Sequence, residues 1–179
     1  MRLKSTLDQY GGMAIALHWI TALLIVALLV LGLNAEDAET DALRRSLLVP
    51  HIVLGLLVLA LTLFRIGWWV FADKKPAPHA SIPPLQNRLA TTLHVILYGV
   101  ILALAASGIA TNIMGGVVDA LASGAPIPSL DDVPPRAVHG MLAWTFMMLL
   151  VFHIGAALYH QFIRRDNLLA RMGIGRKAG

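Results

Sequence analysis

The chain has 179 residues, of which 58% are hydrophobic and 13% charged, and its mean hydropathy is +0.73. This is the composition of an integral membrane protein, and four long apolar runs leave little chain for a separate soluble domain. The absence of cysteine excludes disulfides, thiolate-ligated iron–sulfur clusters and covalently attached c-type haem. The net charge of +4 comes from basic residues spread over several loops, which does not indicate a nucleic-acid partner.

The first predicted membrane helix covers residues 12–33 and follows a short polar start that lacks a signal-peptide cleavage site. His18 lies about six residues inside its first end. Trp19, an interfacial residue type, comes next. We expect residues 34–45, which carry several acidic side chains, to form a polar loop.

The second predicted helix covers residues 47–71 and opens with Pro50 in its first turn, where a missing backbone N–H is tolerated. His51 follows directly. Arg65 lies near the far end, as expected of a side chain that reaches for the membrane surface. The basic and proline-rich residues 73–88 predict a second loop.

The third predicted helix covers residues 89–111 and has His94 near its start. The longest loop, residues 112–135, follows. Its sequence suits one short surface helix around residues 117–122. All other parts of this loop are rich in glycine, proline and acidic residues, which favour turns.

The fourth predicted helix, residues 137–163, carries three histidines on nearly one face. His139 and His153 are fourteen residues apart, a spacing that returns to within about 40° of the same face after about 21 Å of helix rise. His160 follows seven residues later. One helix therefore offers an imidazole near each side of the bilayer, and histidine is costly in lipid unless it has a partner.

The loop charges predict the orientation of these four helices. Eleven of the fourteen lysines and arginines lie at the start, at Arg65 and the 73–88 loop, and in the tail. The positive-inside rule places this side in the cytoplasm, with both termini. We therefore predict an all-α fold: an integral membrane four-helix bundle in a single domain, 1–179.

This orientation sorts the histidines into two levels. His51 and His139 come to the outer side, while His18, His94 and His153 come to the inner side. Two bis-imidazole sites follow, His51 with His139 and either His18 or His94 with His153, as in helix bundles that hold a cofactor between facing side chains. Haem suits this arrangement better than zinc, which needs three or four protein ligands at one level.

Glycine and alanine residues near these levels offer small surfaces against which two stacked b haems can lie. They are Gly55, Gly140, Ala143, Gly155, Ala156 and Ala157. Two axial imidazoles close both coordination positions of a haem iron, which favours electron transfer over oxygen chemistry.

Several motifs resemble the bacterial cytochrome b561 family, the small four-helix di-haem b cytochromes of the inner membrane. They are Leu17-His18-Trp19, His51-Ile-Val-Leu-Gly55, Arg65, Leu93-His94-Val95 through Tyr98, His139-Gly-Met-Leu-Ala143, His153, Tyr159-His160-Gln-Phe, Arg165-Asp166-Asn167, Leu169 and Met172. The resemblance covers nearly the whole chain, and the histidine spacing is its most specific part.

The resemblance implies that His18 and His153 bind the inner haem b and that His51 and His139 bind the outer one. It implies ubiquinone as the membrane partner and, in one branch of the family, superoxide oxidation at a positive outer surface. The predicted outer loops of this chain depart from that branch, because they are net acidic apart from Arg44, Arg45 and Arg136.

Other polar residues are candidates for the quinone end. His94 and His160 are candidate quinone or proton-path residues, since histidine titrates near neutrality. Arg65 and Lys74 are candidates for inner haem propionates or the quinone site, with an ordinary positive-inside cluster as the alternative. His79 is expected to be a plain loop residue.

Three functions are compatible with these features. The first is an oxidoreductase that takes electrons at the outer haem, with superoxide as one candidate donor, and reduces ubiquinone. The second is a membrane-anchor subunit that relays electrons between quinone and a dehydrogenase or hydrogenase partner. The third is a haem-free transporter, against which the lack of intramembrane Asp or Glu argues.

Overall fold

The computed structural model describes residues 2–78 and 82–175, so His79 lies outside the described residues. Its α-helices are α1 (Gly12–Glu36), α2 (Asp41–Gly67), α3 (Pro84–Met114), α4 (Val117–Ser123) and α5 (Pro134–Leu158). Short π-helical segments, Trp68–Ala72 and Tyr159–Arg164, extend α2 and α5, and Leu168–Met172 is a 3₁₀ helix. The described residues contain no strand, which confirms the predicted all-α fold.

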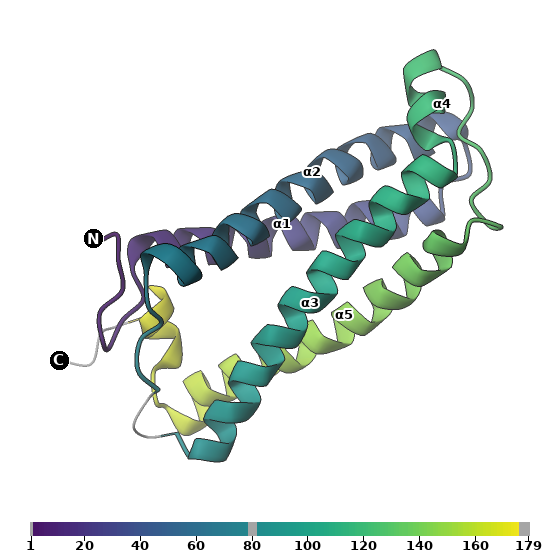
Figure 1. Ribbon diagram of the computed structural model, residues 1–179. Helices are drawn as coiled ribbons and strands as arrows, with labels where there is room; N and C mark the ends of the chain where they lie inside the picture. The colour runs from purple at the N-terminus through teal and green to yellow at the C-terminus, as the bar shows by residue number, and fades with distance from the viewer. Residues whose placement is uncertain (1, 79–81, 176–179) are drawn as a thin grey trace.

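Four long helices build the body of the molecule, with α1 beside α2 and α3 beside α5 (Figure 1). Together with the π-helical extensions they are long and apolar enough to cross a membrane, over Gly12–Glu36, Asp41–Ala72, Pro84–Met114 and Pro134–Arg164. Large aliphatic side chains on their outer faces, such as Leu23 and Val151, are more than half exposed. These faces suit lipid, since lipid tails are as apolar as leucine.

Helices α2, α3 and α5 begin earlier than the sequence predicts, and α1 and α3 end later. Residues 34–45 were expected to form a loop, but only the short stretch 37–40 separates α1 from α2. Thr40 explains the early start of α2, because its side chain accepts a hydrogen bond from the Leu43 N–H at 3.2 Å and caps the helix. Pro50 therefore lies inside α2 and not in its first turn, which corrects the prediction.

The other two long helices start on proline. Pro84 and Pro134 occupy the first positions of α3 and α5, where a fixed φ and a missing N–H fit the first turn. Residues 84–88 therefore belong to α3 and not to the predicted loop. The short surface helix predicted around residues 117–122 is confirmed as α4.

The end of the molecule that carries α4, here called the α4 end, is held by polar contacts between distant segments. The Ile127 N–H donates to Asp41 at 2.7 Å, and the Arg45 guanidinium donates to the Ala120 carbonyl at 3.4 Å. Arg136, at the start of α5, forms an ion pair with Glu36 at the end of α1. These contacts join the α1–α2 turn to the α3–α5 connection.

The opposite end, here called the terminal end, brings together the N-terminal segment, the 73–78 segment and the tail up to residue 175 (Figure 1). The Ser5 hydroxyl donates to Asp73 at 2.8 Å. Arg171 donates to the carbonyls of Asp8 at 2.9 Å and Ala77 at 2.7 Å. The tail thus packs across the N-terminal segment and fixes this end of the bundle.

Candidate functional site

Two histidines face each other between the helix pairs near the α4 end. His51 comes from α2 and His139 from α5, and both side chains are half-buried. Their ring centroids are 6.2 Å apart and their ring planes meet at 76°. The structure therefore brings together the two residues that the sequence places at the outer level.

A second histidine group lies toward the terminal end. His18 of α1 and His153 of α5 have ring centroids 6.3 Å apart, with an angle of 67° between the rings. His94 of α3 is closer to His153, at 5.1 Å, and nearly perpendicular to it at 85°. All three residues predicted for the inner level meet there.

The spacing of the two pairs fits one metal ion between two imidazoles. A metal–imidazole bond is about 2.0 Å long and the ring centre lies about 1.1 Å behind the nitrogen, so axial imidazoles have centroids about 6.2 Å apart. His51–His139 and His18–His153 meet this distance, whereas His94–His153 is about 1 Å too short. Within residues 2–78 and 82–175, no group of three or more His, Asp or Glu side chains could hold a metal ion.

The hydrogen bonds of the His51–His139 pair leave the metal-binding nitrogens free. Nδ1 of His51 lies 3.0 Å from the carbonyl of Leu28, and Nδ1 of His139 lies 3.0 Å from the carbonyl of Leu104. A carbonyl can only accept, so each Nδ1 carries the proton and each Nε2 keeps its lone pair. This is the usual outer-shell arrangement for a metal-bound histidine.

Two glycines that the sequence reasoning missed lie directly against these imidazoles. A Cβ added at Gly32 would lie 3.0 Å from Cε1 of His51, and one added at Gly108 would lie 3.2 Å from Cε1 of His139. Among the glycines expected to border a haem, Gly55 and Gly155 have open surroundings, whereas a Cβ at Gly140 would meet Arg136 at 3.0 Å. The sequence does carry a signal for the missed pair, because each lies fourteen residues after a histidine.

The His18–His153 pair differs from the His51–His139 pair because an arginine, Arg65, lies beside it. Its guanidinium lies 3.4 Å from Nδ1 of His18 and 5.7 Å from the ring centroid of Tyr98. Arginine can only donate, so this contact requires Nδ1 of His18 to accept, unlike its outer counterparts. The Arg65 Nε atom is buried and has no hydrogen-bond partner in the described part of the chain. An anionic group beside Arg65 would satisfy this donor.

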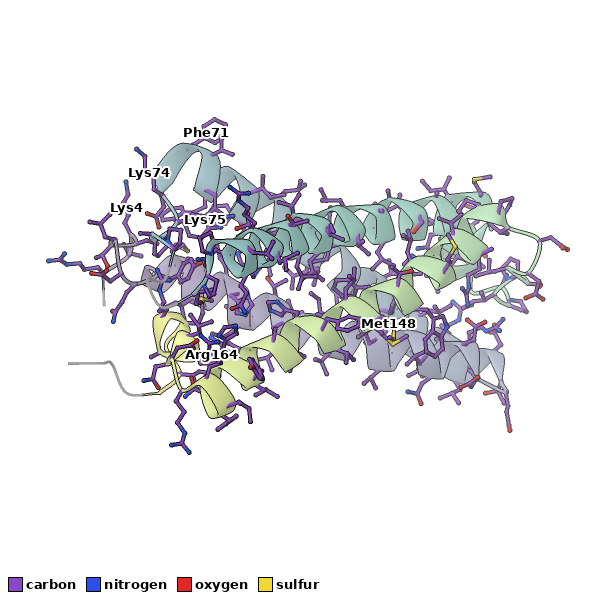
Figure 2. All side chains as sticks on the ribbon, turned by 90° about the horizontal axis from the view of Figure 1, so that it is seen from below. Lys4, Phe71, Lys74, Lys75, Met148 and Arg164 are labelled. Carbon is purple, nitrogen blue, oxygen red and sulfur yellow. The ribbon has the colours of Figure 1, made fainter. Side chains whose placement is uncertain are left out.

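The remaining candidate residues separate in space. His94 lies within the inner histidine group, whereas His160 lies in the π-helical segment after α5, with Nδ1 2.6 Å from a carboxylate oxygen of the largely buried Asp166. Lys74 is exposed at the terminal end, where Lys4, Lys75 and Arg164 also lie (Figure 2). The structure therefore does not bring Lys74 into the histidine group.

Two of the three arginines near the α4 end, Arg45 and Arg136, already have partners. Arg136 is paired with Glu36, and Arg45 lies 4.0 Å from Asp41 and contacts backbone carbonyls of the α4 region. Of the three arginines in the predicted outer loops, these two are thus engaged by the protein itself.

Comparison with known proteins agrees with this arrangement. The prokaryotic cytochrome b561 family matches residues 9–175. Cytochrome b561 homolog 2 of Escherichia coli is 28% identical and covers 96% of this chain and 95% of its own length. Cytochrome b562 of Cereibacter sphaeroides is 32% identical over 91% of this chain and 94% of its own length. Cytochrome b561 homolog 1 of Escherichia coli is 28% identical over 96% of this chain and 100% of its own length. The chain belongs to the prokaryotic cytochrome b561 family and is a multi-pass protein of the bacterial inner membrane that transfers electrons with haem b.

Proposed function

We propose that this protein carries electrons across the inner membrane through two b haems, from a donor on the periplasmic side to ubiquinone near the cytoplasmic side. His51 and His139 would bind the outer haem, and His18 and His153 the inner one. The observation that carries this proposal is the separation of the two ring pairs, 6.2 Å and 6.3 Å, which suits one iron between each pair.

The orientation rests on charge. The terminal end carries Lys4, Lys74, Lys75 and Arg164, and the positive-inside rule assigns such an end to the cytoplasm (Figure 2). The α4 end, with its acidic loops, is then periplasmic. The His51–His139 pair belongs to the periplasmic half and the His18–His153 pair to the cytoplasmic half.

A b haem between two imidazoles supplies reversible one-electron chemistry and offers no open coordination position. The chain holds both outer imidazoles in the proton form that leaves Nε2 available, through the carbonyls of Leu28 and Leu104. At the inner level the unpaired Nε–H of Arg65 is suited to a carboxylate of the haem.

The quinone end would lie on the cytoplasmic side. Reduction of a quinone to the quinol takes two electrons and two protons, so a proton donor must reach it. His160 is suited to that role, because the Asp166 carboxylate fixes its Nδ1 side and leaves Nε2 to exchange protons. Arg65 and His94, beside the inner pair, are candidates to contact a quinone oxygen, and the exposed Lys74 would act only at the mouth of such a site.

The electron donor divides the proposal into two versions. If superoxide is the donor, two superoxide ions release two molecules of oxygen and deliver two electrons, which form one quinol with two protons. The pairing of Arg136 with Glu36 and of Arg45 with Asp41 reduces the positive charge that would attract this anion. That observation favours the second version, in which the protein is a membrane anchor that receives electrons from a protein partner.

Purified protein in liposomes with ubiquinone distinguishes the two versions. Superoxide generated outside the liposomes would reduce ubiquinone in the first version, and added superoxide dismutase would abolish the reaction. In the second version the haems would be reduced by dithionite and reoxidised by ubiquinone, but superoxide alone would give no quinol. Failure of ubiquinone to reoxidise the reduced protein would contradict both versions.

A further inference from the structure

The two helix pairs repeat each other in sequence. Residues of α1 match residues of α3 that lie 76 positions later, and residues of α2 match residues of α5 that lie 88 positions later. The identical pairs include Leu17/Leu93, His18/His94, Leu28/Leu104, Gly32/Gly108, His51/His139, Phe64/Phe152, Ile66/Ile154 and Gly67/Gly155. The second offset is twelve residues larger than the first because the connection between α3 and α5, which contains α4, is longer than the turn between α1 and α2.

The repeat is also visible in the packing. Three buried positions of the first pair correspond to buried positions of the second, namely Thr21 to Leu97, Ala35 to Thr111, and Val58 to Phe146. Both α2 and α5 end in a π-helical segment. Figure 1 shows the α1–α2 pair and the α3–α5 pair as two similar hairpins lying alongside each other. A match in leucine alone would be expected between any two membrane helices, whereas matched histidines, glycines and buried positions are not.

The two pairs share their main contacts at the outer level, where they differ in the Ser107 hydroxyl, 3.1 Å from Nδ1 of His139, which has Leu31 as its counterpart. At the inner level the repeat is broken. His51 has its Nδ1 on the carbonyl of Leu28 and its Cε1 against Gly32, and His139 has the equivalent contacts with Leu104 and Gly108. Both carbonyl distances are 3.0 Å. At the inner level, Arg65 of α2 occupies the position that corresponds to His153 of α5. The two hairpins therefore carry different side chains there.

We infer that Gly32 and Gly108 are positioning residues for the outer haem, one in each repeat. In each hairpin the carbonyl fixes the proton of the imidazole, and the glycine four residues later lets the Cε1–Nδ1 edge of the ring approach the neighbouring helix. Each glycine thus sets the tilt and ring plane of one axial ligand. This inference rests on the proposed function, in which His51 and His139 bind that haem.

Helix packing alone does not explain the two glycines. The atoms nearest to a Cβ built at Gly32 all belong to His51, and those nearest at Gly108 all belong to His139. A carbon–carbon approach of 3.0–3.2 Å is shorter than van der Waals contact, so an alanine would displace the imidazole by a few tenths of an ångström. A glycine without such a neighbour, Gly99 of α3, serves as a matched control because nothing lies within 4 Å of its Cβ position.

The test uses the full chain with its haems and compares Gly32→Ala, Gly108→Ala and Gly99→Ala by low-temperature EPR and redox titration. The g value of a low-spin haem depends on the relative angle of its axial imidazole planes. Gly32→Ala and Gly108→Ala should each shift the low-spin signal and the midpoint potential of the same haem, identified by its loss in His51→Ala. The signal of the other haem should stay in place, and Gly99→Ala should change neither.

The outcomes are separable. Two unshifted haem signals in Gly32→Ala and Gly108→Ala would overturn the inference and leave the proposed function intact. Equal shifts of both haems would overturn it too, because they would indicate a general change in packing. A wild-type protein without a haem that depends on His51 would instead refute the proposed function. Misfolding of these variants is not expected, because alanine has a higher helix propensity than glycine. Circular dichroism of each variant checks that it is folded.

Discussion

The proton on Nδ1 decides which nitrogen of a histidine can bind a metal. At His51 and His139 the Nδ1–H donates to a main-chain carbonyl, so both Nε2 atoms are available. At His18 the same nitrogen faces the Arg65 guanidinium, which can only donate. The proton of His18 then lies on Nε2, so we expect iron binding at His18 to require that Arg65 moves away from Nδ1, whereas the outer site is held ready by the backbone.

Substitution of single histidines should remove single haems. We expect His51→Ala and His139→Ala each to lose one of two haems, and His18→Ala and His153→Ala each to lose the other, because one missing axial ligand weakens the binding of one haem. Pyridine haemochrome assay and reduced-minus-oxidised spectra of the purified variants measure this loss.

His94→Ala is the matched control, because its ring lies only 5.1 Å from His153 and is too close for a shared iron. This variant should keep both haems. Retention of both haems in His18→Ala, together with loss of one in His94→Ala, would show that His94 is the inner ligand.

At the scale of the elements, polar contacts fix where helices begin and how the ends of the bundle close. Thr40 caps α2 and thereby makes the connection from α1 a short turn. Ser5 and Asp73 join the N-terminal segment to the end of α2. The sequence reasoning expected loops at both places, since a cap and a contact between distant residues are not visible in an apolar pattern.

Loss of the Thr40 cap should weaken the start of α2. Thr40→Ala removes the acceptor for the Leu43 N–H, and such caps contribute about 1 kcal/mol to stability. We expect a lower thermal unfolding midpoint in detergent for Thr40→Ala. Thr40→Ser keeps the hydroxyl and should behave like the wild type. Equal midpoints for all three proteins would show that the cap contributes nothing.

The contact between Ser5 and Asp73 should weaken in acid. Partial burial acts to raise the pKa of Asp73, but hydrogen bonds from Ser5, Lys74 and Trp68 outweigh it and hold the pKa below its ordinary value of 3.8. A carboxyl with a lowered pKa in the folded state stabilises the structure fully above pH 3.8 and loses this effect as the pH falls through its folded value.

Hydrogen exchange of the Ser5 amide, corrected for the intrinsic effect of pH, tests this expectation. Protection should be constant above pH 3.8 and fall below it. Asp73→Asn should show low protection without the pH dependence, because an amide does not titrate. Acid loss of protection that persists in Asp73→Asn would assign the effect to another group.

At the scale of the whole molecule, hydropathy predicted the helical architecture well, because lipid demands long apolar helices and leaves few alternatives. The four predicted helices, the short helix now seen as α4 and the meeting of histidines in two groups all follow from spacing along helices. Gly32, Gly108 and the His160–Asp166 contact were not predicted. Their roles depend on which helix lies next to which, and local periodicity does not contain that information.

The proposed orientation can be tested with single cysteines, since the natural chain has none. Ser123→Cys places a thiol at the α4 end, and Lys4→Cys places one at the terminal end; both positions are exposed. A membrane-impermeant maleimide added to spheroplasts should label Ser123→Cys at once and Lys4→Cys only after lysis. The reverse pattern would invert the topology and exchange the inner and outer haems.

The most direct test of the central claim is the haem content of the wild-type protein. A pyridine haemochrome titration with a reduced-minus-oxidised spectrum of detergent-purified protein should give about two b haems per chain, both with a low-spin alpha band. One haem per chain would mean that one of the two histidine pairs does not bind haem. Well-folded protein without two low-spin b haems would contradict the account.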